Sequence, residues 1–267
     1  MGCYTDDFLF VHIPKTGGTA VKAALWEQVP GMKGQRPAFP GSGEAERGKD
    51  PNDPFPIGHM RLRDVERILG RPWGSFKQVV AVIRNPYVQQ VSQWLFWLDR
   101  YHRGGRHLHD LAAAGYATIH GFLEDPRCDF HRWYSEEFRL GDTRFVPTND
   151  YKDFGGTYLW WLEGSDGKIP SNLVLLRQEQ LAGDFARWSR ESFGRPLEVP
   201  PMNVGKWDHD KLLEYLVHPD RPHDTMRALD LIEAKFRWAF GLHYVHIDRS
   251  QFIGAWLDAG LITPTGG

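Results

Sequence analysis

Three short apolar runs, each followed by a polar turn and then a helical pattern, organise the chain. They occupy residues 8–13, 79–83 and 173–176. Nearly continuous runs of β-branched and leucine residues are typical of strands that are buried on both faces of a parallel sheet. The pattern therefore predicts three parallel strands at these positions.

Apolar residues recur at spacings of three and four after each run, as one face of a helix requires. The predicted helices cover residues 19–28 and 87–101 and a segment that starts near Leu181. Strands that alternate with helices favour an α/β fold. We expect a single domain over residues 1–267, P-loop-like, with a central parallel sheet flanked by helices.

Two further helices are predicted at residues 62–69 and 224–240, with Gly241 as the stop of the second. The Gly- and Pro-rich residues 30–56 are expected to form a loop or a cover. Residues 102–170 are rich in His, Trp, Tyr and Gly and have weak periodicity, which predicts an irregular, mostly helical insertion.

Composition narrows the class of protein. Of the 267 residues, 41% are hydrophobic and 25% are charged, which is typical of a globular protein. The net charge of -2 gives no overall indication of nucleic-acid binding. The two cysteines, Cys3 and Cys128, cannot form a disulfide framework, which favours a reducing, cytoplasmic location. No apolar run approaches the roughly 18 residues of a membrane span, and the N-terminus does not resemble a secretory signal.

The turn after the first run reads Pro-Lys-Thr-Gly-Gly-Thr-Ala, residues 14–20. Glycines allow the backbone to direct several N–H groups at one point, and a following helix adds the positive end of its dipole. Lys15 supplies a charge, and Thr16 and Thr19 supply hydroxyl donors. These residues predict a cradle for a phosphate or sulfate ester, although a tight turn with an exposed lysine is the alternative. It is not a Walker A loop, because Lys15 precedes the glycines.

Residues 12–19, His-Ile-Pro-Lys-Thr-Gly-Gly-Thr, resemble the 5′-phosphosulfate loop of sulfotransferases that use 3′-phosphoadenosine 5′-phosphosulfate (PAPS). The resemblance is closest to the carbohydrate branch that includes heparan sulfate 2-O-sulfotransferase. A second family signature is an Arg at a strand end, then a Pro and a Ser, which here are Arg84, Pro86 and Ser92. The resemblance covers residues 8–28 and 57–98 well and residues 171–190 more weakly.

The resemblance implies two anion sites that match the two phosphate groups of PAPS. Lys15, Thr16, Gly17, Gly18, Thr19 and Ala20 would hold the 5′-phosphosulfate, and Arg84 and Ser92 would hold the 3′-phosphate. Asn203 and Lys206 lie where the family has a loop that covers PAPS. Ala20 departs from the family, which commonly has Ser there, and Asn85 replaces a frequent Asp.

Sulfuryl transfer needs a base for the acceptor hydroxyl and a stabiliser for the leaving phosphate. Lys15 is expected to be the stabiliser. His59, in the sequence Ile-Gly-His-Met, resembles the segment that carries the catalytic histidine of the family branch and is expected to be the base. A histidine that only packs a strand end is the alternative, and His12 is expected to be structural.

The sequence thus predicts an enzyme that transfers a sulfuryl group from PAPS to an acceptor hydroxyl, releases adenosine 3′,5′-bisphosphate and needs no metal. A carbohydrate acceptor is favoured by the motif branch, and a small alcohol, a phenol or a lipid is the alternative. A nucleotide-dependent phosphotransferase and a non-catalytic nucleotide-binding module are further alternatives. No nucleic-acid partner is expected, and the sequence does not indicate an oligomeric state.

Overall fold

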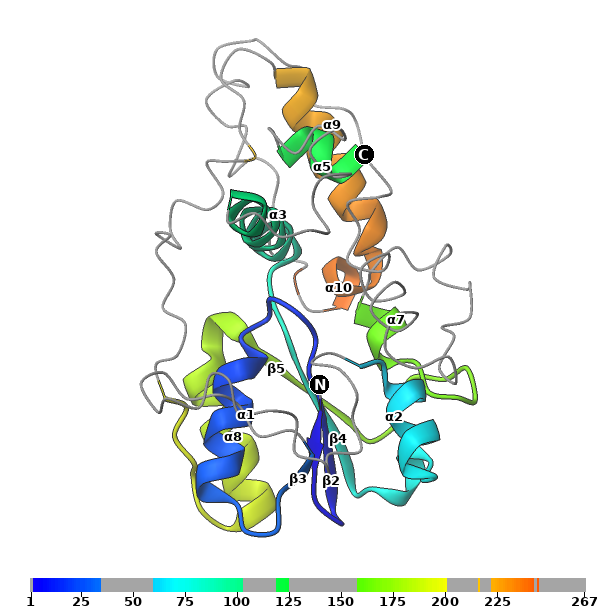
Figure 1. Ribbon diagram of the computed structural model, residues 1–267, viewed down its shortest axis with the longest axis vertical. Helices are drawn as coiled ribbons and strands as arrows, with labels where there is room; N and C mark the ends of the chain where they lie inside the picture. The colour runs from blue at the N-terminus through cyan, green and yellow to red at the C-terminus, as the bar shows by residue number, and fades with distance from the viewer. Residues whose placement is uncertain are drawn as a thin grey trace. The chain divides into compact units, whose positions relative to one another are not determined.

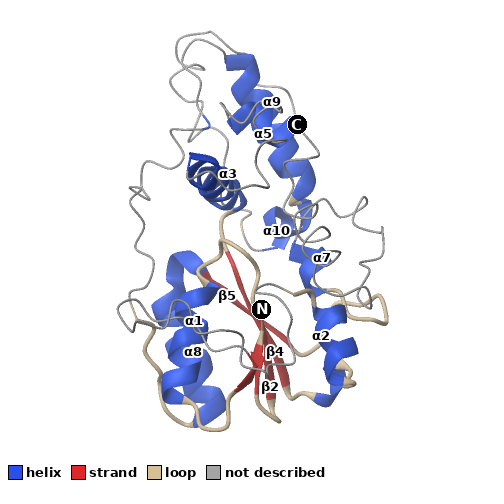
Figure 2. Ribbon diagram, in the orientation of Figure 1, coloured by secondary structure: helices blue, strands red, loops and turns tan. Residues whose placement is uncertain are grey.

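A computed structural model describes residues 2–34, 60–102, 119–124, 158–200, 216, 222–242 and 244. The chain divides into two compact units, Met1–Arg84 with Tyr158–Val204, and Asn85–Thr157 with Gly205–Gly267. Every strand of the described residues lies in the first unit, and the described part of the second is helical (Figures 1 and 2). The single domain expected from the sequence stays a prediction.

The sheet of the first unit has five strands in the order β3-β1-β2-β4-β5. The three predicted strands are present as β2 (Phe8–Val11), β4 (Gln78–Ile83) and β5 (Leu173–Arg177), and they are parallel to one another. Two short strands, β1 (Cys3–Tyr4) and β3 (Lys33–Gly34), pair antiparallel at one edge. The sheet is therefore mixed, and the α/β class is confirmed with a parallel centre only.

The antiparallel edge arises from a short turn in which the Thr5 hydroxyl oxygen accepts hydrogen bonds from the backbone N–H groups of Asp7 (3.2 Å) and Phe8 (3.3 Å). This turn folds β1 back on β2, so that Cys3 lies opposite Phe10. A Ser or Thr hydroxyl commonly nucleates such turns. Lys33, the first residue of β3, pairs with Asp6 at 2.8 Å and lies in the segment predicted to be a loop. The rest of that segment, residues 35–56, lies outside the described residues.

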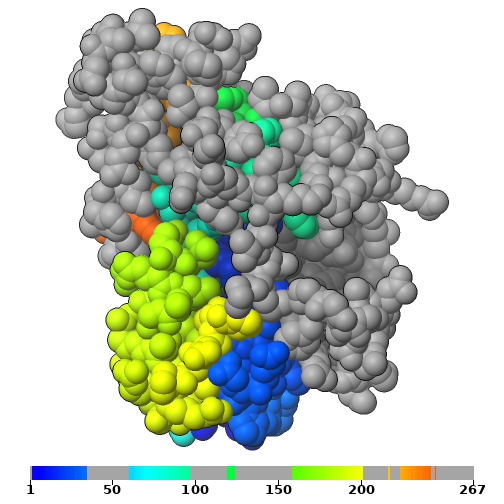
Figure 3. All heavy atoms as spheres, turned by 90° about the vertical axis from the view of Figure 1, so that its left-hand side faces the viewer, coloured from blue at the N-terminus to red at the C-terminus, as the bar shows by residue number. Residues whose placement is uncertain are grey.

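Helices cover both faces of the sheet (Figures 1 and 2). Helices α1 (Gly18–Gln28) and α8 (Leu181–Phe193) lie side by side on one face, as Figure 3 also shows. Helix α2 (Leu62–Leu69) lies on the other face and packs against α7 (Tyr158–Leu162). Two 3-10 turns, η1 (Trp73–Ser75) and η5 (Gln178–Gln180), precede β4 and α8. The helices predicted at residues 19–28 and 62–69, and the one from Leu181, are confirmed.

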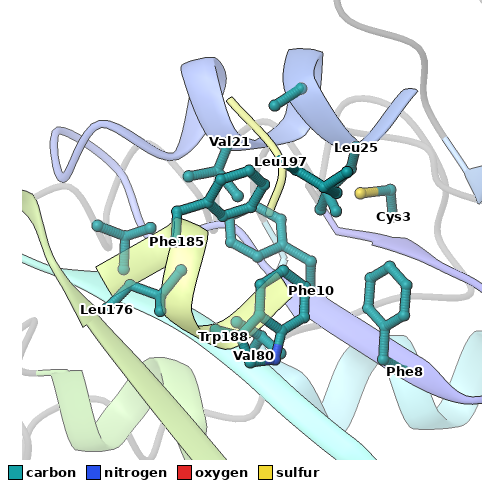
Figure 4. Close-up of a cluster of buried hydrophobic side chains, with 12 residues drawn as sticks. Cys3, Phe8, Phe10, Val21, Leu25, Val80, Leu176, Phe185, Trp188 and Leu197 are labelled. Carbon is teal, nitrogen blue, oxygen red and sulfur yellow. The ribbon is translucent and has the colours of Figure 1, made fainter. Parts of the chain in front are cut away.

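The core between the sheet and helices α1 and α8 is built from bulky apolar side chains (Figure 4). Phe10 and Val80 from the strands meet Val21 from α1 and Phe185 from α8, and all four are buried. Aromatic edge-to-face contacts add to the packing, with the Phe8 and Trp188 rings 5.6 Å apart. This core fixes the start of α1 against the end of β2.

The second unit contains α3 (Pro86–His102), α5 (Ile119–Glu124), α9 (Pro222–Lys235) and α10 (Arg237–Leu242). Helix α9 packs against α3 and α5. The single helix predicted at residues 224–240 is divided at Phe236. Helical hydrogen bonding continues across the break, because the Phe236 N–H donates to the Ile232 carbonyl at 2.9 Å and the Phe240 N–H donates to the Phe236 carbonyl at 3.1 Å. Gly241 lies inside α10, so its prediction as a stop was wrong.

The predicted insertion at residues 102–170 contains α5 and α7, and its remainder lies mostly outside the described residues. No helix among the described residues is long and apolar enough to span a bilayer.

Candidate functional site

The carboxyl ends of the three parallel strands lie at the same end of the sheet. A basic residue follows each strand or is its last residue. Lys15 follows β2, Arg84 follows β4, and Arg177 is the last residue of β5. The register aligns these ends, since Ile83 lies opposite Arg177. Ligands of open α/β sheets bind at the carboxyl ends of the strands. This end of the sheet is therefore the place to look for an anion site.

The loop between β2 and α1 has two residues in the left-handed backbone region. Gly17 precedes α1 with φ 88°, and Lys15 has φ 62°, the only described residue other than glycine with a positive φ. Glycine adopts this region freely, whereas an L-residue with a long side chain does so at a cost of roughly 1–2 kcal/mol. The loop thus holds Lys15 in an unfavourable conformation.

The ring of His12 fills the space beside Gly18, so that residue 18 must be a glycine. A Cβ added at Gly18 would lie 2.9 Å from His12 Nε2 and nearer still to Cδ2, so no side chain fits there without displacing the imidazole. The His12 ring is buried and stacks on Phe10, with 6.2 Å between ring centroids. The placement of His12 agrees with the structural role that the sequence predicted for it.

The first turn of α1 favours an anionic ligand. Its N-cap residue, Gly17, has no side chain to form a capping hydrogen bond, and no acidic residue lies in its first turn. Thr19 is half-buried and Ala20 is buried, and the Ala20 N–H donates to the Gly17 carbonyl at 3.1 Å. Thr16 is fully buried, and its hydroxyl donates to the Ile13 carbonyl at 2.9 Å. In this conformation the Thr16 side chain ties the loop together, and the helix dipole and Lys15 supply the positive potential.

Arg84 connects the end of β4 to this loop. Its side chain is buried, and its Nη1 donates to the Lys15 carbonyl at 3.2 Å. A guanidinium carries five N–H donors in a rigid plane, which suits bidentate contacts to phosphate oxygens. The structure therefore brings together two of the predicted residues, Lys15 and Arg84, through this hydrogen bond within the first unit.

The turn after β5 forms a second wall beside the loop. A Cβ added at Gly17 would lie 3.1 Å from Gln178 Cγ and 3.6 Å from Leu181 Cδ2, so these side chains lie beside the glycine, which stays exposed. The turn is held by Asp184, whose Oδ2 accepts from both the backbone N–H and the Nε of Arg177, each at 3.1 Å. Burial raises the pKa of Asp184, but the hydrogen bonds and charge of Arg177 and Arg187 outweigh burial and hold it below its usual range.

The remaining predicted residues are not brought to the loop by any described contact. Ser92 lies half-buried on α3 in the second unit, and its convergence with Arg84 stays a prediction. His59, Asn203 and Lys206 lie outside the described residues.

Sequence reasoning missed two neighbours of the site. Tyr158, on α7, contacts the Arg84 backbone through its hydroxyl group, and Gln178 packs on Gly17. The apolar sequence Tyr-Leu-Trp-Trp-Leu at residues 158–162 signals a buried helix, but nothing in it indicates a contact with β4. Gln178 follows the β5 run directly, and its position at a strand end was the available signal.

No group of histidine, cysteine, aspartate and glutamate side chains suited to a metal ion occurs in the described part of the chain. Comparison of the chain with models of protein families, with curated proteins and with solved structures gives no match.

Proposed function

We propose that this protein is a sulfotransferase that uses PAPS as its sulfuryl donor. The observation that carries the proposal is the loop after β2, in which a strained Lys15 precedes a helix whose N-cap is a glycine. The carbonyl of Lys15 accepts a hydrogen bond from the side chain of the buried Arg84. The mixed α/β sheet supports it because the loop lies at the carboxyl ends of parallel strands.

The hydrogen-bond donors of the described residues suit a nucleotide that carries two separate anionic groups. Gly17 is exposed, which leaves its backbone accessible to an oxyanion, and α1 adds its dipole. Lys15 and Arg84 add two full positive charges, and no carboxylate lies in the first turn of α1 to oppose an anion. Thr19, Ser92, Asn203 and Lys206 are proposed as further contacts.

Lys15 would stabilise the negative charge that develops on the bridging oxygen of the leaving phosphate. Bound PAPS supplies the sulfuryl group. His59 is proposed from the sequence as the base that accepts the proton of the attacking hydroxyl, since a neutral imidazole titrates near neutral pH. The acceptor is proposed to be a carbohydrate hydroxyl, with a small alcohol, a phenol or a lipid as the alternative.

Arg84→Ala tests the cofactor assignment. Binding of adenosine 3′,5′-bisphosphate should weaken about ten- to hundredfold, the size of a charge-assisted hydrogen bond. Binding of adenosine 5′-phosphosulfate, which lacks the 3′-phosphate, should weaken less, because only the contact between Arg84 and the Lys15 carbonyl is then lost. Calorimetric titration of both nucleotides measures the difference. Arg190→Ala, an exposed arginine on α8, is the control and should bind both nucleotides as the wild type does.

Turnover of labelled PAPS against glycans and small alcohols tests the reaction itself. Transfer to any hydroxyl supports the proposal, and the acceptor that is used identifies the substrate class. Tight bisphosphate binding with no transfer across the panel would indicate a non-catalytic module. A wild-type protein that binds neither nucleotide would overturn the proposal, as would phosphoryl transfer from a magnesium nucleotide instead.

A further inference from the structure

One tyrosine hydroxyl holds both main-chain polar groups of Arg84. The backbone N–H of Arg84 donates to Tyr158 Oη at 3.1 Å, and the same hydroxyl donates to the Arg84 carbonyl. Tyr158 is 1% exposed, and Arg84 is 4% exposed. Two buried peptide groups are therefore paired by a single side chain from α7.

This contact lies where the β-ladder ends. Ile83 is the last residue of β4 and pairs with Arg177, and Arg84 is the next residue along the chain. Buried backbone groups need partners once a ladder stops, and leaving them unpaired is costly. Tyr158 provides these partners and so fixes the direction in which the chain leaves the sheet.

Arg84 in turn contacts residues 14–19, the loop between β2 and α1, which we call the anion loop. Arg84 Nη1 donates to the carbonyl of Lys15, whose backbone is in the left-handed region. The order of contacts runs from the Tyr158 hydroxyl to the Arg84 backbone, and from the Arg84 side chain to the Lys15 carbonyl. All three residues belong to the first unit.

We infer that Tyr158 is a positioning residue that aligns Arg84 for the 3′-phosphate and, through Arg84, orders the Lys15 loop. This inference rests on the proposed function, because the 3′-phosphate is the ligand assigned to Arg84. Burial raises the pKa of Tyr158 far above its ordinary value, so the hydroxyl keeps the proton that it donates to the Arg84 carbonyl.

Tyr158→Phe isolates the hydroxyl, because the ring and its packing remain. The preference for adenosine 3′,5′-bisphosphate over adenosine 5′-phosphosulfate, measured as a ratio of dissociation constants, should fall about three- to tenfold, the size of one neutral hydrogen bond. Tyr87→Phe is the matched control. Tyr87 is equally buried, but its hydroxyl donates to Glu233 in the second unit, so the ratio should not change.

A double-mutant cycle separates positioning from general loosening of the fold. Tyr158→Phe should lower the nucleotide preference in the wild-type background and have no further effect in Arg84→Ala, because both changes act through the same guanidinium. Equal losses in the two backgrounds, or a full preference in Tyr158→Phe, would overturn the inference while leaving the proposed function intact.

Hydrogen exchange gives a readout that needs no ligand. In Tyr158→Phe, but not in Tyr87→Phe, the peptides that contain Arg84 and residues 14–19 should exchange faster than in the wild type. If the wild type shows no preference between the nucleotides, the proposed function is wrong, and so is the assignment of Arg84 to the 3′-phosphate. Exchange then decides alone whether Tyr158 orders the loop, and unchanged exchange would overturn that part as well.

Discussion

A lysine in the left-handed backbone region is an expensive choice of residue. At Lys15, with φ 62°, a glycine would remove the steric conflict between Cβ and the backbone. The lysine side chain therefore contributes something that the conformation of the loop alone does not require. In the proposed reaction that contribution is the charge beside the leaving phosphate.

Lys15→Gly should separate this chemical role from folding. The free energy of unfolding should change by less than about 1 kcal/mol, because relief of the strained φ offsets the greater freedom of glycine in the unfolded chain. The rate of sulfuryl transfer should fall about 10²–10³-fold, as for loss of one oriented transition-state group. Thermal melts and single-turnover rates measure the two effects.

Lys15→Ala should lose rate similarly while keeping the strained backbone. Lys77→Ala, which removes an exposed lysine paired with Asp7 at 2.9 Å, is the control and should turn over normally. Near-normal transfer by Lys15→Gly would refute the role of the lysine charge.

At the scale of elements, hydrogen bonds to Asp184 join the end of β5 to α8 and hold the turn that lies beside the loop at residues 14–19. Asp184 is buried on the first turns of α8 and accepts hydrogen bonds from Arg177 at the end of β5, and from Arg187 at 2.6 Å. Arg177 and Arg187 are partly exposed, so solvent weakens the charge attraction, and the buried hydrogen bonds to the carboxylate dominate.

Asp184→Asn should destabilise the fold by about 1–3 kcal/mol at neutral pH. Because the folded-state pKa of Asp184 is lowered, its stabilising contribution is fully present above the ordinary aspartate pKa of about 3.9 and is lost as the pH falls through the lowered value. Denaturant unfolding between pH 7 and pH 3 measures the difference in the free energy of unfolding between wild type and variant. This difference should decrease only toward the acid end of the range. Glu191→Gln, an exposed carboxylate on the same helix, should show no such difference.

The elements with strong hydrophobic patterns could be predicted from the sequence. The three parallel strands and the helices that follow them are set by runs and spacings that few other structures satisfy, and residues 62–69 form a helix as expected. The two-residue strands β1 and β3 could not be predicted, because two residues carry no periodicity and their pairing depends on the turn at Thr5.

The candidate site was predictable in its local part only. The loop at residues 14–20 is recognisable because glycine, lysine and threonine lie between a strand and a helix. The contact between Tyr158 and Arg84 joins residues that are far apart in the chain, and such pairing leaves no local pattern. The inward turn of the Thr16 hydroxyl depends on the Ile13 carbonyl and was equally hidden.

At the scale of the whole molecule, the first unit is assembled from two separate stretches of chain. Its sheet needs β5, and its core needs Leu176, Phe185 and Trp188, all of which come after residue 157. Without them β4 would be an exposed edge with one apolar face uncovered by α8, a feature that promotes aggregation.

A fragment of residues 1–157 should therefore lack a cooperative thermal transition and should be largely insoluble. Co-expression with a fragment of residues 158–267 should restore a soluble complex, because the missing strand and helix are then supplied in trans. Circular dichroism melts and size-exclusion chromatography measure the outcome. A cooperative melt of the 1–157 fragment alone would contradict the assignment of β5 and α8 to the core of the first unit.

The same interleaving has a consequence for synthesis on the ribosome. When Arg84 leaves the exit tunnel, β2 and β4 are available, but the strand that completes the sheet begins at Leu173, roughly 90 residues later. At about 5–20 residues per second, the nascent half-sheet waits roughly 4–18 s for its last strand. During that interval the apolar face of β4 is the surface that a chaperone would cover, and the anion loop takes its final form only after α7 has been translated.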